Sequence, residues 1–158
     1  MRLILTAVLL FAPVAGAADK YDGPRPPKPD LPYLVHADNL IPTEAAEAKE
    51  DSKKDETTYT MPGVSSPART PLAEPIFIID SDRVMPDRLE LYRWDVKNGR
   101  RELALSKARK RGNNKALHLQ VTRLEGNLYR VEASEPLDNG EYSLSPNDSN
   151  KVFCFEVF

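Results

Sequence analysis

The second half of this chain consists of short segments with strand character separated by turn residues, and this spacing constrains the fold more than any other feature. Between residues 75 and 158 there are seven such segments, at 76–79, 89–96, 103–105, 117–121, 129–133, 142–144 and 152–158. Apolar and polar residues alternate strictly over 117–122, which is typical of a strand with one buried face. Closely spaced strands without helical periodicity predict an all-β protein, an antiparallel β-sandwich of about seven or more strands.

Turn residues mark where the predicted strands are joined. Asn98-Gly99 favours a two-residue hairpin, because a type I′ turn needs a positive φ at both central positions. Glu125-Gly126 and Asn139-Gly140 are further turn signals. The segments 76–79 and 152–158 are apolar on both faces, so we expect each of them inside a sheet that other elements cover.

Residues Leu137–Leu144, with the sequence LDNGEYSL, resemble the tyrosine corner of immunoglobulin-like β-sandwiches. The resemblance implies an immunoglobulin-like sandwich in which Tyr142 returns its hydroxyl to the backbone a few residues upstream. The chain departs from the antibody pattern at Leu144, where that family has a disulfide cysteine. Trp94 is then either the buried core tryptophan or an aromatic side chain on a strand face. The layout of the whole chain also resembles small exported bacterial proteins of unassigned function.

Residues 1–17 have the organisation of a secretory signal peptide. Arg2 precedes an apolar run from Leu3 to Ala12, and Ala15-Gly16-Ala17 supplies a small-residue cleavage site. The run is shorter than the about 20 residues that cross a bilayer, so we expect no transmembrane span in the mature chain. These residues predict a secreted or periplasmic protein.

The rest of the chain divides into two regions. Residues 18–32 contain five prolines and predict an extended strap, because proline fixes φ and removes a hydrogen-bond donor. Residues 33–158 predict a single β-sandwich domain, with further candidate strands at 33–36 and 57–60. Within it, residues 44–56 are highly charged and have alanine as their only apolar type, which predicts a charged loop or short helix.

Charge and cysteine content limit the classes of partner. The formal net charge is only −2, which argues against nucleic acid as a partner. Cys154 is the only cysteine, so no intrachain disulfide forms, and its apolar surroundings predict that it is buried. An alternative is assembly: if the C-terminal strand lies at a sheet edge, it can pair with another chain and Cys154 can cross-link the pair.

No catalytic, cofactor-binding or metal-binding motif is present, so the sequence predicts a protein that is not an enzyme. His36 and His118 lack further residues at metal-ligand spacing, and no serine lies in a nucleophile elbow. Asp80, Asp82 and Asp87 are a weak candidate for Ca²⁺, because their loop lacks the glycine and distal glutamate of an EF-hand. The alternative is a secreted enzyme with an unrecognised site around His36 or around the loop 80–87.

A basic tract is the sharpest local feature of the sequence. Residues 97–115 contain eight cationic side chains and one anionic side chain, Glu102. We expect a projecting loop whose anion-binding residues are Lys107, Arg109, Lys110, Arg111 and Lys115. Such a loop can contact an anionic envelope polymer or lipid headgroups, which makes the chain an exported, non-catalytic binding or structural module. The alternative is a solvated loop that keeps a sheet edge from pairing.

Overall fold

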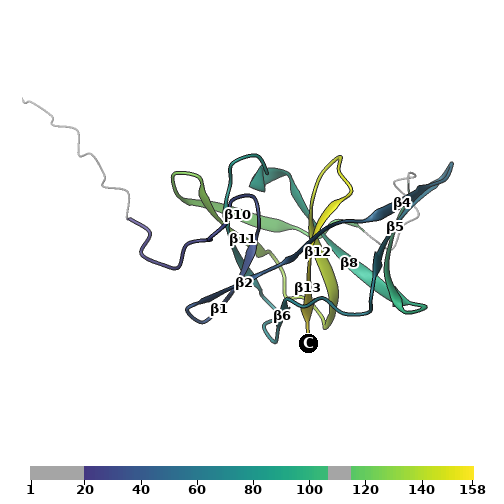
Figure 1. Cartoon of the computed structure of the whole chain (residues 1–158), viewed down its shortest axis with the longest axis horizontal. Helices are drawn as coiled ribbons and strands as arrows, with labels where there is room; N and C mark the ends of the chain where they lie inside the picture. The colour runs from purple at the N-terminus through teal and green to yellow at the C-terminus, as the bar shows by residue number, and fades with distance from the viewer. Residues whose placement is uncertain (1–19, 107–114) are drawn as a thin grey trace, which may run out of the picture.

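The computed structural model describes residues 20–106 and 115–158, and these residues form an almost entirely β-structure (Figure 1). The predicted signal peptide, residues 1–17, lies outside the described residues. The strands of the first half of the chain are β1 (Tyr33–His36), β2 (Asn39–Pro42), β3 (Glu44–Glu47), β4 (Lys49–Ser52), β5 (Glu56–Pro62), β6 (Arg69–Thr70) and β7 (Ile76–Asp80). The described residues of the second half form a 3-10 turn, η1 (Pro86–Arg88), and the strands β8 (Leu89–Lys97), β9 (Arg100–Ser106), β10 (Leu119–Glu125), β11 (Leu128–Ala133), β12 (Gly140–Pro146) and β13 (Lys151–Val157).

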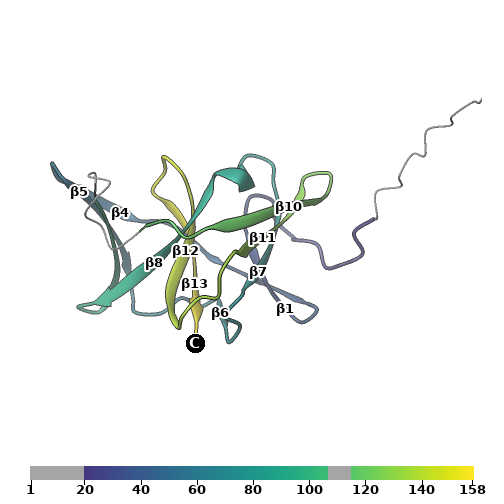
Figure 2. The ribbon, with the colours of Figure 1, turned by 180° about the vertical axis from the view of Figure 1, so that it is seen from behind.

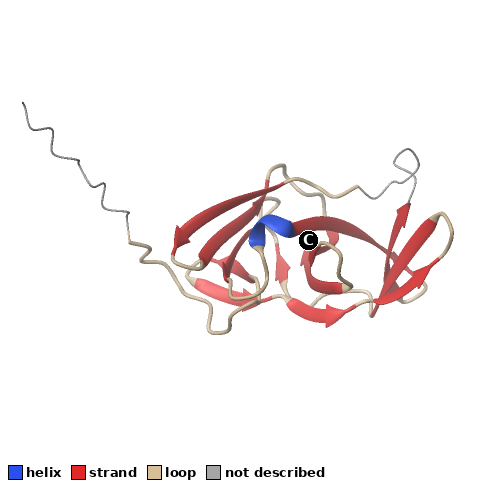
Figure 3. Cartoon of the chain, turned by 90° about the horizontal axis from the view of Figure 1, so that it is seen from above, coloured by secondary structure: helices blue, strands red, loops and turns tan. Residues whose placement is uncertain are grey.

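The strands form two sheets, one five-stranded and one eight-stranded (Figures 2 and 3). The five-stranded sheet has the order β10-β11-β7-β1-β2, and the eight-stranded sheet has the order β3-β13-β12-β8-β9-β5-β4, with β6 beside β13. All pairs are antiparallel except β6 with β13. The all-β, antiparallel prediction is therefore confirmed, and the seven predicted segments correspond to β7 to β13.

A sandwich core lies between the five-stranded sheet and one face of the eight-stranded sheet. Phe77 of β7 meets Phe155 of β13 edge to face, with ring centroids 4.8 Å apart, and Tyr142 of β12 stacks on Phe155. The Tyr142 hydroxyl donates a hydrogen bond of 2.8 Å to the carbonyl of Asp138, the bond expected at a tyrosine corner. The immunoglobulin-like type of the sandwich stays a prediction.

The eight-stranded sheet closes on itself through one continuous segment of chain. Strands β3 and β4 stand at opposite ends of the sheet order, yet only Ala48 separates them. The segment 44–52 pairs with β13 through its first half and with β5 through its second half. At the junction, the Ala48 N–H donates to the carbonyl of Asn150 at 2.8 Å. We call the closed unit of β13, β12, β8, β9, β5 and the segment 44–52 the rolled sheet.

The prediction of a charged loop or short helix at 44–56 is wrong for residues 44–52. Residues 44–49 alternate with a period of two, because Ala46 and Ala48 belong to or pack on a buried cluster while Ala45, Glu47 and Lys49 are exposed. The inward positions 46 and 48 are both alanine, so no large apolar residue marks the strand. Pairing with β13 and β5 therefore outweighs the helix propensity of alanine, glutamate and lysine.

The interior of the rolled sheet is a second core, on the opposite face of β8 from the sandwich core. Its buried members are Ala48, Met61, Trp94, Leu103, Val152 and Cys154. Trp94 is therefore a buried tryptophan, but it lies inside the rolled sheet and not between the two sheets of the sandwich. Cys154 is buried, as predicted.

The C-terminal strand is not a sheet edge. Strand β13 pairs with β12 on one side and with β3 and β6 on the other. Both rows of its backbone hydrogen-bonding groups therefore have partners within the chain, and its cysteine is enclosed. The premise of assembly through an open β13 is wrong.

The proline-rich strap is fastened to the domain by its last residues. Asp30 Oδ1 accepts hydrogen bonds from the backbone N–H groups of Asp82, Arg83 and Val84 at 3.0, 2.7 and 2.8 Å. Earlier in the strap, Arg25 pairs with Glu125 at the β10–β11 turn. The strap thus lies against the five-stranded sheet, at the end of the molecule opposite β4 and β5 (Figure 1). Among the described residues, no helix has the length and apolar character needed to span a membrane.

Candidate functional site

The rolled sheet has one open end, which forms a groove of about 490 Å³. Strands β4, β5, β8, β9, β12 and β13 all contribute side chains to the groove, and residues 146–150 form one side of its rim. A volume of this size falls in the range of small-molecule sites, and sites of this kind favour the open ends of closed sheets. We call this feature the open groove.

The floor of the open groove is built around Trp94. Its indole Nε1 donates a hydrogen bond of 2.8 Å to Ser143 Oγ, which in turn lies 2.9 Å from Ser145 Oγ. Leu103 and Val152 supply apolar floor beside the indole. Trp94 is only 3% exposed, yet it lines the groove, so its indole forms the bottom of the groove.

Two half-buried tyrosines and two glutamates form the walls. The Tyr92 hydroxyl donates a hydrogen bond of 2.7 Å to Glu90 Oε2. Burial and this bond to Glu90 raise the pKa of Tyr92 well above its usual value, so the phenol stays neutral. On the other side, Glu50 of β4 is the direct cross-strand neighbour of Tyr59 of β5. Each tyrosine ring therefore stands beside a carboxylate.

The opposite end of the rolled sheet is closed by a buried ion-pair network. Arg101 Nη1 donates to Glu44 Oε2 at 2.6 Å and to Ser66 Oγ at 2.6 Å, and its Nη2 donates to Glu44 Oε1 at 3.1 Å. The Ser66 hydroxyl donates to Glu141 Oε2 at 2.5 Å, and Arg101 lies 3.6 Å from the same oxygen. Among the described residues, these groups fill one end of the rolled sheet, and the open groove lies at the other.

The charge state of this network follows from its burial. Desolvation raises the pKa of Glu141 above its usual value, although the hydrogen bonds from Ser66 and the Arg101 guanidinium oppose the rise. Burial also raises the pKa of the nearby Cys154 thiol to about 12. The thiol is therefore protonated at neutral pH and is a poor nucleophile.

The basic tract is only partly described. Lys107, Arg109, Lys110 and Arg111 lie outside the described residues, so their anion-binding role stays a prediction. Lys115 is exposed and lines a hollow of about 200 Å³ together with Arg93, His118, Glu135 and Asp138, whose charges are balanced.

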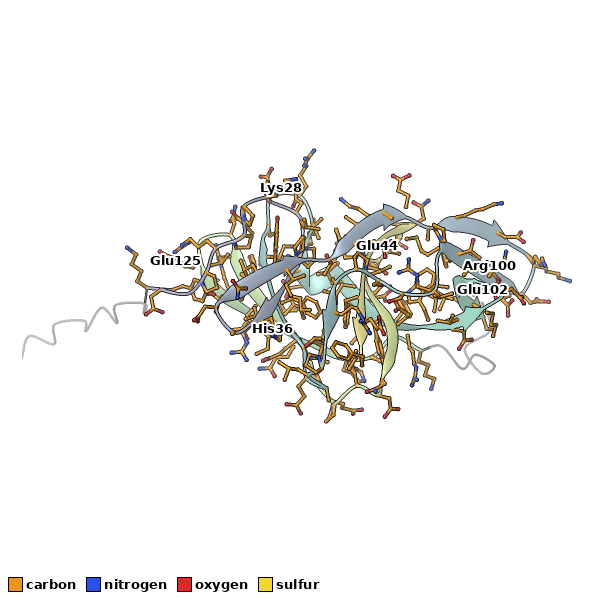
Figure 4. All side chains as sticks on the ribbon, turned by 60° about the horizontal axis from the view of Figure 1, so that its bottom comes forward. Lys28, His36, Glu44, Arg100, Glu102 and Glu125 are labelled. Atoms are coloured by element: carbon orange, nitrogen blue, oxygen red, sulfur yellow. The ribbon has the colours of Figure 1, made fainter. Side chains whose placement is uncertain are left out.

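The start of the basic tract does not present free positive charge. Lys97 pairs with Asp95 at 2.9 Å, and Arg100 pairs with Glu102 at 2.5 Å (Figure 4). Arg101, which the tract also includes, is only 1% exposed. Its side chain points into the rolled sheet because it alternates with Arg100 and Glu102 along β9.

The other candidate residues of the sequence do not converge. His36 is exposed at the end of β1, a strand of the five-stranded sheet (Figure 4). His118 is exposed and lines the smaller hollow. In the loop 80–87, the backbone N–H groups of residues 82–84 point at the carboxylate of Asp30. These N–H groups therefore bind a carboxylate of the strap. Within residues 20–106 and 115–158, no group of three metal-ligating side chains lies close enough to hold a metal ion.

Sequence reasoning missed the open groove. One signal was present, because Glu90, Tyr92 and Trp94 alternate along one strand and place two aromatic rings and a carboxylate on the same face. One partner of that face, Glu50, comes from the segment 44–52, which joins it only when the sheet closes, and the others come from neighbouring strands far apart in the sequence. The comparisons give no further guide: no family model, no curated protein and no solved structure matches this chain.

Proposed function

We propose that this chain is an exported, non-catalytic binding module whose ligand occupies the open groove. The observation that carries the proposal is the asymmetry of the rolled sheet. One end is closed by Arg101 and its carboxylate partners, and the other is a groove of about 490 Å³ with aromatic walls. Export follows from the signal peptide predicted at residues 1–17.

The geometry favours binding over the alternative of a secreted enzyme. Neither histidine lines the open groove, and both serines that line it have hydrogen-bond partners. Ser145 pairs with Ser143 at 2.9 Å, and Ser149 accepts a hydrogen bond of 3.0 Å from the Lys151 N–H. The single buried thiol, Cys154, lies in the core beneath the floor and is held protonated. The groove thus offers aromatic, apolar and acidic side chains to a ligand, and none of its described residues is an activated nucleophile.

The single tryptophan supplies a direct test. The chain from residue 18 to 158 is titrated with choline, N-acetylglucosamine and inorganic phosphate, which are cationic, neutral and anionic probes. Saturable change in Trp94 fluorescence, or in its indole NMR resonance, is expected with at least one probe. The variant E50R, which alters the groove wall, is expected to change that affinity. The variant D51R alters the outward face of the same strand and is expected to leave it unchanged.

Either of two results would overturn the proposal. One is the absence of a saturable Trp94 response to all three probes. The other is a response that E50R and D51R change equally, because the ligand would then sense net charge and not the groove. Cell fractionation of the full chain tests export separately, with a mature N-terminus at Ala18 as the expected result.

A further inference from the structure

The charged side chains that line the open groove are all negative among the described residues. Its described lining includes three carboxylates, Glu50, Glu90 and Asp148, and no lysine or arginine. Lys49, on the same strand as Glu50, does not line the open groove but a neighbouring hollow on the outer face, which Glu50 also borders. A groove with focused negative potential concentrates cations and repels anions.

The aromatic content of the groove narrows the kind of cation. Tyr59 and Tyr92 flank the opening, and the indole of Trp94 lies below them. Aromatic faces attract organic ammonium groups through their ring quadrupole, and alkyl substituents on nitrogen add apolar contact. Because the Tyr92 hydroxyl is engaged with Glu90, that ring and that carboxylate are held together in a fixed arrangement.

A metal ion does not fit the same arrangement. Small divalent cations need several oxygen ligands converging at about 2.0–2.6 Å. Among the residues that the structure describes, the groove carboxylates are too dispersed to form such a group of three. Dispersed carboxylates suit a larger cation whose charge is spread over an alkylated nitrogen.

We propose that the ligand of the open groove is a small organic ammonium ion, seated between Tyr59 and Tyr92 and neutralised by Glu50 and Glu90. This inference rests on the proposed binding function and specifies its ligand class. The groove volume suits a small molecule, and an ammonium group carried by a lysine side chain of a peptide is an alternative that the test separates.

The test uses a matched pair of probes with the chain 18–158. Choline and its uncharged isostere 3,3-dimethylbutan-1-ol have nearly the same shape and differ in charge. Choline is expected to bind about tenfold or more tightly than the isostere, measured by Trp94 fluorescence or calorimetry. Its affinity is expected to fall with added salt, because the attraction is electrostatic.

Variants locate the site. E50Q and E90Q are each expected to weaken choline binding by about twofold to fivefold, the range of a partly exposed ion pair. D51N also removes one negative charge, but Asp51, the neighbour of Glu50 in the sequence, lies on the outward face of the strand. This variant is expected to leave choline affinity unchanged. Thermal unfolding of each variant checks that the fold is retained.

The outcomes distinguish failure of the ammonium inference from failure of the proposed function. Equal binding of choline and its isostere overturns the ammonium inference and leaves the groove as a binding site. Binding of an acetylated lysine amide together with no binding of choline also overturns it, in favour of a peptide partner. Tighter binding of N-acetylglucosamine or phosphate than of choline has the same effect. If no probe changes the Trp94 signal, the proposed function itself fails.

Discussion

Arg101 and Glu44 form a two-point ion pair inside the rolled sheet, with distances of 2.6 and 3.1 Å between guanidinium nitrogens and carboxylate oxygens. They are 57 positions apart in the sequence, one from the basic tract and one from the charged segment 44–56. Each belongs to a region that resembles exposed surface in the sequence. Their pairing closes one end of the rolled sheet and leaves the other end as its open groove.

Replacing Arg101 with methionine is expected to lower the free energy of unfolding by about 3–5 kcal/mol, because it leaves Glu141 buried without its cation. The matched variant R100M removes the neighbouring arginine, whose pair with Glu102 is partly exposed, and is expected to cost about 1 kcal/mol or less. Urea unfolding measures both. The double variant R101M/E141Q is expected to recover part of the loss, and equal effects of R100M and R101M would contradict the buried role.

Asp30 is expected to make folding stability depend on acid pH. Burial alone would raise the pKa of Asp30, but hydrogen bonds from three backbone N–H groups outweigh it and lower the pKa below its usual value. Because the folded pKa is the lower one, this stabilisation is present above about pH 4, the unfolded value, and is lost as pH falls through the folded pKa.

The variant D30N tests this linkage. It is expected to be less stable than the parent by about 1–2 kcal/mol at neutral pH, since it loses charge-assisted hydrogen bonds. The difference is expected to shrink as the pH is lowered below about 4. D82N removes an exposed carboxylate in the same loop and serves as the control. A stability difference for D30N that stays constant with pH would contradict the assignment.

Cys154 is expected to be unreactive in the folded protein. Burial in the rolled sheet raises the pKa of its thiol to about 12, so little thiolate forms at about pH 8 and access is blocked. A colourimetric thiol reagent is expected to react only after denaturant is added. The variant S149C, which places a thiol on the exposed rim of the open groove, is expected to react at once. A disulfide-linked dimer of the parent chain on a non-reducing gel would contradict this prediction.

The predicted basic loop has its own test. Reversing the charges of Arg109, Lys110 and Arg111 to glutamate is expected to abolish retention on vesicles containing phosphatidylglycerol at low salt. The control reverses Lys20, Lys28 and Lys49, which are exposed and change the net charge by the same amount. Equal loss of retention in both triple variants would show that net charge, and not the loop, is responsible. Unchanged retention would remove the loop hypothesis.

Local patterns in the sequence predicted the second half of the fold. Alternating residues placed β10, and Asn98-Gly99 placed the β8–β9 hairpin, where the two residues have φ values of 51° and 75°. The eight residues around Tyr142 predicted its hydrogen bond to Asp138. Each of these features depends on residues close together in the chain, so its signal is complete within a short window.

Closure of the rolled sheet was decided by the tertiary structure alone. The segment 44–52 has no local preference for a strand, and it becomes one only because β13 and β5 both offer unpaired edges to it. The burial of Arg101 and the meeting of Glu50 and Tyr59 with Tyr92 follow from that closure. The periodicity of the sequence determined that the chain forms strands and where most of them lie. Which charged side chains are buried, and where a groove remains, depended on contacts between distant segments, because a charge or an alanine is accommodated by its surroundings and does not specify them.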